Sequence, residues 1–475
     1  MPHTLARPTD PRESAPPRPG GLVAVLAFAG IVTASMQTLV IPLVPRLPAL
    51  LGASPADATW AVTATLLAAA VATPVVGRLG DMVGKRRMLL ISLALLTAGS
   101  AIAALSTGLT PMIVGRALQG LSAGVIPLGI SIMRDELPPE RLGTATATMS
   151  SSMGIGGAIG LPAAALIADH ADWHILFWIS AGLGAIAAVL VLTLIPESRV
   201  RTGGRFDLIG AAGLSTILVC LLLAISKGTD WGWTSAATLG LLTTAAIVLP
   251  AWAWWQRRTR HPLIDLRTST QRQVLLTNLS SATFGFAMFG LSLVLPQLLQ
   301  LPTTTGYGLG QSMLTVGLVL APQGLVMMVV SRWSARISAT HGPNITLMLG
   351  ALVVATGYGL AIVLMSAIWH LVLVACILGA GVGLAYGAMP ALVMAAVPIS
   401  ETAAANSLNT LMRAIGTSVS SALAGTVLAH LTITLGGTTL PSQNGLRTVL
   451  AICAGAALAA LAIAAFLPRQ RKDER

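Results

Sequence analysis

Two arginines inside apolar segments are the residues of this chain most able to do chemistry in a membrane. Arg116 stands about six residues into segment 110–133, and Arg413 about eleven residues into segment 402–431. A rise of 1.5 Å per helical residue makes these depths ~9 Å and ~17 Å. A charge so deep costs ~2.5–3.5 kcal/mol and usually faces a cavity or a partner. We expect both to line a water-filled pocket. The alternatives are an Arg116 that extends to the outer interface and an Arg413 that only links helices by hydrogen bonds.

The sixteen acidic residues are informative by their positions, because all fall in loops or at the ends of apolar segments. A proton relay in a membrane normally uses an embedded acid or histidine. The remaining candidates for proton coupling are Asp57, Asp135, Glu136 and His430. A pocket whose embedded charges are arginines should suit neutral or anionic substrates better than lipophilic cations.

Soft and polar side chains within the apolar segments are candidates for contact with a substrate. Methionine is flexible and polarizable, so it suits a pocket that accepts varied ligands. Each candidate taken alone is explained equally well by helix packing. With Arg413, the candidates are Met36, Gln37, Gln297, Gln300, Tyr386, Met389 and Asn409.

Composition predicts the elements that must position these residues. Only 9% of the 475 residues are charged and 55% are hydrophobic. A membrane-spanning helix needs ~20 mostly apolar residues, and the chain lacks the alternating ~10-residue segments of a membrane β-barrel. We therefore predict an all-α, polytopic membrane protein with about fourteen spans, at 21–45, 58–77, 88–106, 110–133, 143–168, 173–195, 207–226, 233–255, 273–299, 308–331, 344–366, 369–397, 402–431 and 445–467.

The basic residues behind the net charge of +12 lie mainly in the loops between the predicted spans. Most of the 28 basic residues fall on the side of the predicted spans that holds both termini. Basic loops stay in the cytoplasm, so both termini are predicted to be cytoplasmic. The charge is thus a topology signal and indicates no nucleic-acid partner. The three cysteines are isolated in separate spans, which predicts neither a disulfide framework nor a metal site.

A weak internal repeat divides the chain. GRLGDMVGKRR (77–87) corresponds to ARISATHGPN (335–344), ALQGLSAG (117–124) to ILGAGVG (377–383), and MGIGG (153–157) to MRAIG (412–416). The repeat pairs spans 1–6 with spans 9–14 in parallel orientation, and such halves usually rock around a midplane site. The predicted parts are a disordered tail at 1–20, a six-helix bundle at 21–195, a linker at 196–206, two inserted helices at 207–255, a basic linker at 256–272, a second six-helix bundle at 273–467 and a tail at 468–475.

Two motifs could control the movement of these halves. In 77–87, the Asp81 carboxylate can face the positive N-terminal end of a neighbouring helix, which stabilises by ~0.3–1 kcal/mol when exposed and up to ~2 when partly buried. Breaking that contact would favour the inward-open state; the alternative is a charged turn that only fixes topology. In GIGGAIGLP (154–162), Gly156 and Gly160 permit close helix packing and Pro162 bends the helix. That helix could seal a leak between the halves, although packing alone would also explain it.

These motifs resemble those of the major facilitator superfamily. The segment 77–87 looks like its loop signature, through Gly77, Asp81, Gly84, Lys85 and Arg86. RALQG (116–120) is similar to its fourth-helix signature, through Arg116, Gln119 and Gly120. GIGGAIGLP resembles the antiporter signature of exporters, with Leu161 inserted between Gly160 and Pro162. Fourteen spans are typical of its drug:proton antiporter-2 type.

The resemblance implies two pseudo-symmetric six-helix bundles plus two inserted helices, and a latch between Asp81 and the second helix from the C-terminus. It also implies a secondary exporter of drugs, antibiotics or metabolites that works by proton-coupled alternating access. The alternative is an uptake permease or facilitator for a neutral or anionic metabolite. We expect a monomer in a bacterial inner membrane whose partners are small molecules, protons and lipid. No catalytic constellation, metal site, cofactor site or ATP-binding loop is present in the sequence.

Overall fold

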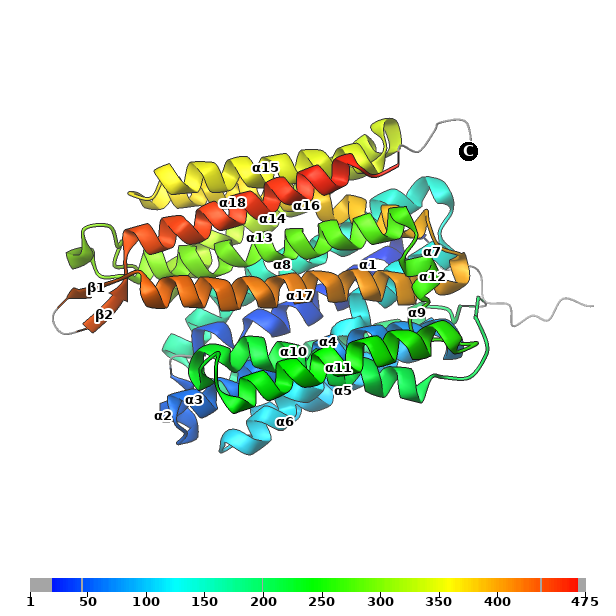
Figure 1. The fold of residues 1–475 in the computed structure, drawn as a ribbon, viewed down its shortest axis with the longest axis horizontal. Coiled ribbons are helices and arrows are strands. Elements are labelled where there is room, and N and C mark those ends of the chain that lie inside the picture. The colour runs from blue at the N-terminus through cyan, green and yellow to red at the C-terminus, as the bar shows by residue number, and fades with distance from the viewer. Residues whose placement is uncertain (1–18, 44–45, 199, 436–437, 469–475) are drawn as a thin grey trace, which may run out of the picture.

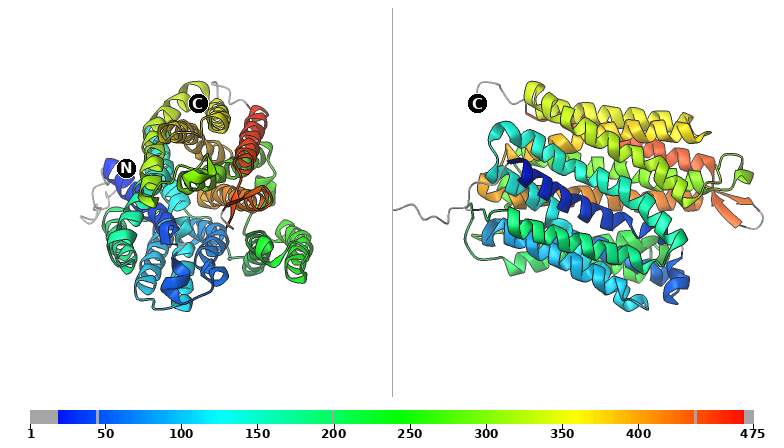
Figure 2. Two further views of the ribbon diagram at one scale, coloured as in Figure 1. Left: turned by 90° about the vertical axis from the view of Figure 1, so that its left-hand side faces the viewer. Right: turned by 180° about the vertical axis from the view of Figure 1, so that it is seen from behind.

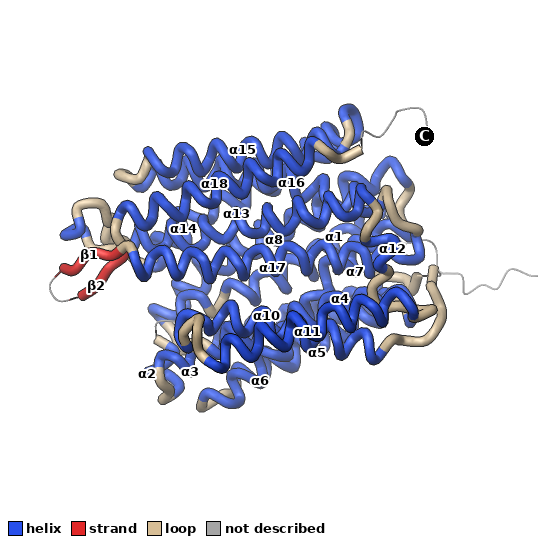
Figure 3. The backbone as a smooth tube through the Cα atoms, viewed as in Figure 1, coloured by secondary structure: helices blue, strands red, loops and turns tan. Residues whose placement is uncertain are grey.

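The structure is a computed structural model that describes residues 19–43, 46–198, 200–435 and 438–468. Nearly all of the predicted tails, 1–20 and 468–475, lie outside these residues. Within them, fourteen helical segments are long and apolar enough to cross a membrane. They run side by side, with loops gathered at two opposite ends (Figures 1 and 3). The fold class predicted from the sequence is confirmed.

The fourteen spans follow chain order. The first six are α1 (Pro19–Thr38), α4 (Trp60–Val83), α5 (Lys85–Ala104), the joined α6 (Leu109–Gly120), η2 (Leu121–Gly124) and α7 (Val125–Glu136), α8 (Pro139–His170) and α9 (His174–Leu194). Two middle spans are α10 (Leu208–Trp231) and α11 (Ala236–Arg258). The last six are α13 (Arg272–Gln300), α14 (Met313–His341), α15 (Pro343–Val363), α16 (Ile368–Met394), α17 (Thr402–His430) and α18 (Gln443–Ala465).

Short elements mark the two ends of the bundle. One end carries η1 (Ile41–Leu43), α2 (Leu47–Leu51), α3 (Pro55–Ala58), η3 (Thr303–Thr305) and an antiparallel hairpin of β1 (Thr432–Leu435) and β2 (Thr438–Pro441), in which Thr432 pairs with Pro441. We call it the hairpin end. The opposite end carries α12 (Leu266–Ser269) and η4 (Ile399–Glu401), and we call it the α12 end.

Helix packing repeats after an offset of eight spans. In the first half, α1 packs on α8 and α9, α4 on α6, and α5 on α6 and α9. In the second half, α13 packs on α17 and α18, α14 on α16, and α15 on α16 and α18. These are equivalent pairs, so each half is a six-helix bundle of the same design. The halves meet where α8 packs on α14 and where α4 packs on α17.

The middle helices form a pair beside the two bundles. α10 packs on α11 and also contacts both α4 and α17 (Figure 2). At the hairpin end, the Lys227 ammonium donates to the Thr59 hydroxyl at 2.5 Å and lies 5.5 Å from the centre of the Trp60 ring. The pair is therefore fastened to the first half by a polar contact.

Three helix ends differ from the sequence prediction. α4 continues to Val83 and α14 to His341, so that the predicted turns shrink to single glycines. Gly84 has φ 133° and Gly342 has φ 94°, a region that residues with a Cβ rarely adopt. α1 ends at Thr38 instead of residue 45, because the prolines of IPLVP (41–45) remove backbone donors that a longer helix would need.

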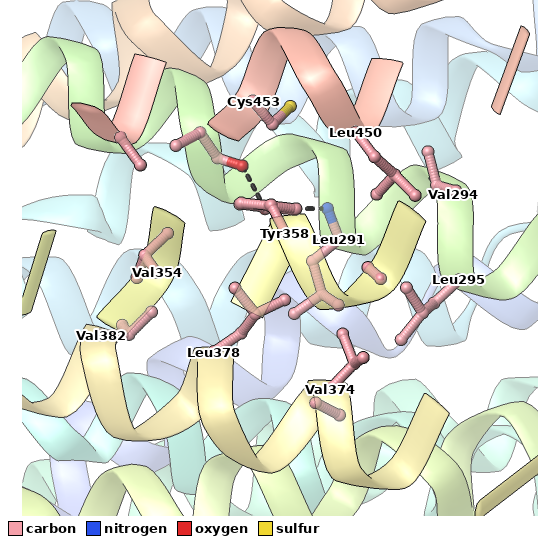
Figure 4. Packing of buried hydrophobic residues seen from close by; sticks show 14 of the residues in the cluster. Leu291, Val294, Leu295, Val354, Tyr358, Val374, Leu378, Val382, Leu450 and Cys453 are labelled. Atoms are coloured by element: carbon pink, nitrogen blue, oxygen red, sulfur yellow. Dashed lines mark hydrogen bonds between the residues drawn. The ribbon is translucent and has the colours of Figure 1, made fainter. Parts of the chain in front are cut away.

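The second bundle has a dense apolar core with one polar feature. Tyr358 is fully buried among Leu291, Leu378 and Cys453 (Figure 4). Its hydroxyl donates to the Ala287 carbonyl and accepts from the Leu291 amide at 3.2 Å. Because both contacts reach α13 from α15, they fix the position of the helix that lines the pathway described below.

Candidate transport pathway

A cleft of about 290 Å³ lies between the two halves. Its walls come from α1 and α8 of the first half and from α13, α14 and α16 of the second. Two predicted substrate residues, Gln37 and Tyr386, line it. None of the described residues that line it is charged. Gln323, a polar residue of a predicted span that could line a cavity, is also part of the lining. Four methionines and two hydroxyl-bearing residues that we did not include among the candidates complete its soft and polar lining: Met153, Met288, Met313, Met327, Thr38 and Ser292.

Arg413 lies below this cleft, in a smaller cavity that shares Tyr386 and Met153 with it. The guanidinium stacks on the Tyr386 ring at 4.7 Å and donates to the Asn409 side-chain oxygen at 3.2 Å. Asn409 donates in turn to Asn278 and Ser281 of α13. Arg413 is thus half-buried, held by its own helix and α16, and positioned at the floor of the cleft. A charge-assisted donor there could bind an acceptor on a ligand.

Arg116 occupies a different environment from the predicted one. Its side chain is 2% exposed and enclosed between α1, α4 and α6 of the first half. The guanidinium donates to the carbonyls of Ala61 and Met36 at 3.1 and 3.2 Å and to Gln119 at 2.6 Å. The expectation that Arg116 faces the pocket is therefore corrected. Carbonyl oxygens near the ends of α1 and α4 satisfy its donors inside the bundle, and this arrangement gives no signal in the sequence.

Four further candidates lie away from the described cleft lining. Met36 is 3% exposed in the core of the first half, and Met389 is fully buried, where its sulfur accepts from the Ser281 hydroxyl at 3.2 Å. Gln300 is exposed at the last turn of α13 and donates to the Pro296 carbonyl. The Gln297 side-chain oxygen is buried without a hydrogen-bond donor among the described residues. Hydropathy alone does not tell the core face of a span from its cavity face.

The glycine-rich helix α8 packs against both halves. A Cβ added to Gly156 would stand 2.6 Å from that of Ala34, and one added to Gly160 would stand 3.3 Å from the Ser35 backbone, so these glycines contact α1. Pro162 packs on α14, where a Cβ at Gly317 would stand 2.9 Å from the proline nitrogen. α8 is therefore tightly enclosed on both sides. Gly120 plays a similar packing part where η2 approaches α4, near Ala68.

Asp81 joins the halves at the α12 end. Its carboxylate is fully buried and accepts from the backbone amides of Ala403 and Ala404, at 3.2 and 2.8 Å. These are the first amides of α17, which have no acceptor within their own helix. At Gly77, a Cβ would stand 2.8 Å from the Ala403 carbonyl, so only glycine permits this approach of α4 to α17.

A buried cation supports this contact. The Lys85 ammonium lies 2.6 Å from Asp135 and 3.7 Å from Asp81, and it is fully buried. Asp135 also accepts from the Ser198 hydroxyl. The guanidinium of Arg134, which we did not single out from the sequence, crosses to the second half and donates to the Met394 carbonyl at 2.7 Å. The sequence indicated this role only through the position of Arg134, which stands next to Asp135 at the end of a predicted span.

The remaining ionisable candidates are dispersed. Arg86 donates to the Leu192 carbonyl of α9. The Asp57 carboxylate accepts from the hydroxyl of Ser54, the residue that caps α3 at the hairpin end, and the exposed His430 contacts the carbonyl of Thr426 in its own helix. Glu136 is exposed at the end of α7. The structure thus gathers Asp81, Lys85 and Asp135 at the α12 end and leaves the other candidates apart.

Residues 26–421 match the family model for the Major Facilitator Superfamily. The chain therefore belongs to this superfamily. It is a multi-pass membrane transporter and not an enzyme. The described residues contain fourteen candidate spans, which is the number predicted from the sequence.

Curated relatives of this superfamily member are bacterial transporters. An uncharacterized MFS-type transporter of Mycobacterium tuberculosis is 27% identical over 87% of the chain, and the match spans 60% of that relative's length. The multidrug resistance protein Stp of the same species is 28% identical over 78% of the chain and 68% of the relative. Multidrug resistance protein 3 of Bacillus subtilis is 26% identical over 78% of the chain and 72% of the relative.

A solved superfamily structure shares the fold. The crystal structure of the human organic anion transporter MFSD10 (TETRAN) aligns with a TM-score of 0.66, covering 94% of this chain and 100% of that one, at 16% identity. At this identity the likeness describes the fold of both chains and carries no information on substrate.

Proposed function

We propose that this transporter exports small molecules by alternating access. The observation that carries the proposal is the cleft that both halves line, above a tightly packed contact of α4 with α17 at the α12 end. If the halves rock about this cleft, breaking the contact of Asp81 with α17 opens the α12 end. Movement of packed bundles around a midplane site is the usual mechanism of such repeats. The names of the relatives as multidrug resistance proteins favour drug efflux.

The lining of the cleft favours neutral or anionic amphiphilic substrates. Methionines adapt to varied shapes, and the Arg413 guanidinium at the floor offers charge-assisted donors to an acceptor. A lipophilic cation would meet this positive charge without an acidic partner among the described lining residues. We propose that Arg413 selects against such cations.

Proton coupling is proposed to act at the α12 end. Asp135 has one buried oxygen without a donor among the described residues and a second oxygen shared by Lys85 and Ser198. Protonation of Asp135 would weaken its pairing with Lys85 and so loosen the support of Asp81. We propose that this end faces the cytoplasm from a bacterial inner membrane, because basic residues gather in the loops at this end, and that the monomer is the functional unit.

Uptake or facilitated diffusion is the second candidate function. It is favoured by the cleft itself, since none of its described lining residues is an acid that could carry a proton through the membrane centre. A facilitator would move substrate down its gradient without moving protons.

Transport into proteoliposomes with an imposed pH gradient separates these functions. The panel is an anionic dye, a neutral drug and ethidium, with proton movement followed by a trapped fluorescent indicator. We expect substrate-induced proton flux with the anion and the neutral drug, and a large loss of anion transport in Arg413→Ala. Arg336→Ala removes an exposed charge of α14 and is the matched control. Strong ethidium export by the unaltered protein would contradict the substrate class, and transport without proton flux would support the facilitator.

A further inference from the structure

A second cavity, of about 360 Å³, lies at the α12 end outside the transport pathway. Its walls come from the end of α4, the start of α17, and the two linkers that flank the α10–α11 pair. Both linkers make contacts that hold them in the wall of this cavity. The Thr202 amide donates to the Asp81 carbonyl at 2.8 Å, and the His261 ring packs against Gly204, whose φ of 90° turns the first linker toward the second.

Three arginines from three separate segments line this cavity: Arg78 of α4, Arg201 of the first linker and Arg260 of the second. Two acids also line it. The Asp265 carboxylate already accepts from the Arg267 amide at 2.8 Å as the cap of α12, while Glu401 belongs to η4 at the entrance to α17. The formal balance of the described lining residues is thus positive.

Arg78 is the unusual member of this set. Its side chain is only 9% exposed, and its guanidinium interacts electrostatically with the Asp81 carboxylate but makes no hydrogen bond and no close ion pair with any residue that the structure describes. A buried guanidinium normally has hydrogen-bond acceptors, because burying its donors without them is costly. The Thr202 hydroxyl in the same wall is also buried without a partner among the described residues. The site therefore offers unsatisfied donors to a ligand that carries several acceptors.

We propose that this cavity binds a phosphate-bearing anion held by Arg78, Arg201 and Arg260. A phosphate group accepts paired hydrogen bonds from guanidinium groups in fixed geometry. Leu263, Val274 and Leu408 also line the cavity, so its lining can contact the carbon skeleton of a ligand beside the phosphate. Both an anionic phospholipid headgroup and a soluble phosphate ester meet these requirements, and basic pockets between helices at a membrane face bind such headgroups. A bound anion would tie both linkers to α4 beside the Asp81 contact.

Direct binding to the purified full-length protein tests the site without a gradient or a transport substrate, so its result is independent of the proposed export. The probes are short-chain phosphatidylglycerol, sn-glycerol 3-phosphate, inorganic phosphate and, as the zwitterionic comparison, short-chain phosphatidylcholine. Titration calorimetry compares the unaltered protein with the double variant Arg201→Ala/Arg260→Ala, whose replaced side chains are exposed. Arg332→Ala/Arg336→Ala removes two exposed charges from α14 at the same end and is the matched control.

We expect at least one anionic probe to bind more tightly than phosphatidylcholine. Its affinity should fall at least tenfold in Arg201→Ala/Arg260→Ala and change less than twofold in the control. Preference for phosphatidylglycerol assigns the site to a membrane lipid, and equal binding of sn-glycerol 3-phosphate assigns it to a soluble ester. Equal losses in both double variants would show only a surface-charge effect and would overturn the proposal, as would the absence of binding by every anionic probe.

Discussion

Replacing Asp81 by asparagine is the sharpest test of the contact between the halves. The carboxylate accepts from two amides of α17, and a hydrogen bond to a charged group contributes ~1.5–3 kcal/mol. Asparagine keeps one acceptor oxygen and loses the second hydrogen bond and the charge. The state with a closed α12 end should therefore be destabilised by about 2 kcal/mol relative to the open state. At ~1.4 kcal/mol per tenfold, this is a shift of roughly 30-fold toward the open state. Lys85 keeps Asp135 as its partner at 2.6 Å, so the variant should still fold.

Distances across the α12 end would report this shift. Spin labels at Arg141 of α8 and Thr340 of α14, both exposed, stand on the two halves at the α12 end in a background without the three native cysteines. Electron–electron resonance should show a larger long-distance population in Asp81→Asn. Asp57→Asn removes the same charge from a local cap at the hairpin end and should leave the distribution unchanged. If Asp81→Asn shifts the populations less than twofold, the contact does not hold the halves together and the reasoning fails.

Three further predictions concern stability and coupling. Lys85→Met should lower the stability of the folded protein by ~3–5 kcal/mol, because it leaves buried carboxylates unpaired. In thermal unfolding, the double variant Lys85→Met/Asp135→Asn should recover part of the lost stability, and no recovery would mean that Lys85 and Asp135 are not coupled. Tyr358→Phe should cost ~1–3 kcal/mol in the same assay, since the Ala287 carbonyl loses its buried donor, whereas unchanged unfolding would show that water replaces the hydroxyl. Asp135→Asn should abolish substrate-induced proton flux in proteoliposomes while His430→Gln retains it; the reverse result would place coupling at the hairpin end.

Hydropathy predicted the number of spans, because the bilayer imposes a length on every apolar run. It failed at the helix ends for a physical reason. α4 continues past its apolar run, because Asp81 in this extension finds hydrogen-bond donors at the start of α17. Gly84, which has a positive φ, ends this extension of α4.

The site was less predictable than the fold. The motif placed Asp81 near the beginning of α17, and the depth of Arg413 placed it at the floor of the cleft. Depth gave the wrong environment for Arg116, because it does not tell which side of a helix faces the cavity. The cleft-lining methionines were missed for the same reason, since a methionine on a core face and one on a cavity face look alike in sequence.

The α10–α11 pair has a consequence for any movement of the bundles. α10 holds the first half through Lys227 and Thr59, while its contact with α17 is made by aliphatic side chains such as Leu411 and Ile415. A hydrogen bond breaks when its two partners slide past each other. An aliphatic contact between two helices depends less on direction and tolerates sliding better. The α10–α11 pair should therefore move as a rigid body with the first half, while the second half slides against it at α17. A covalent bridge from α10 to α17 would then stop the cycle, and one from α10 to α4 would not.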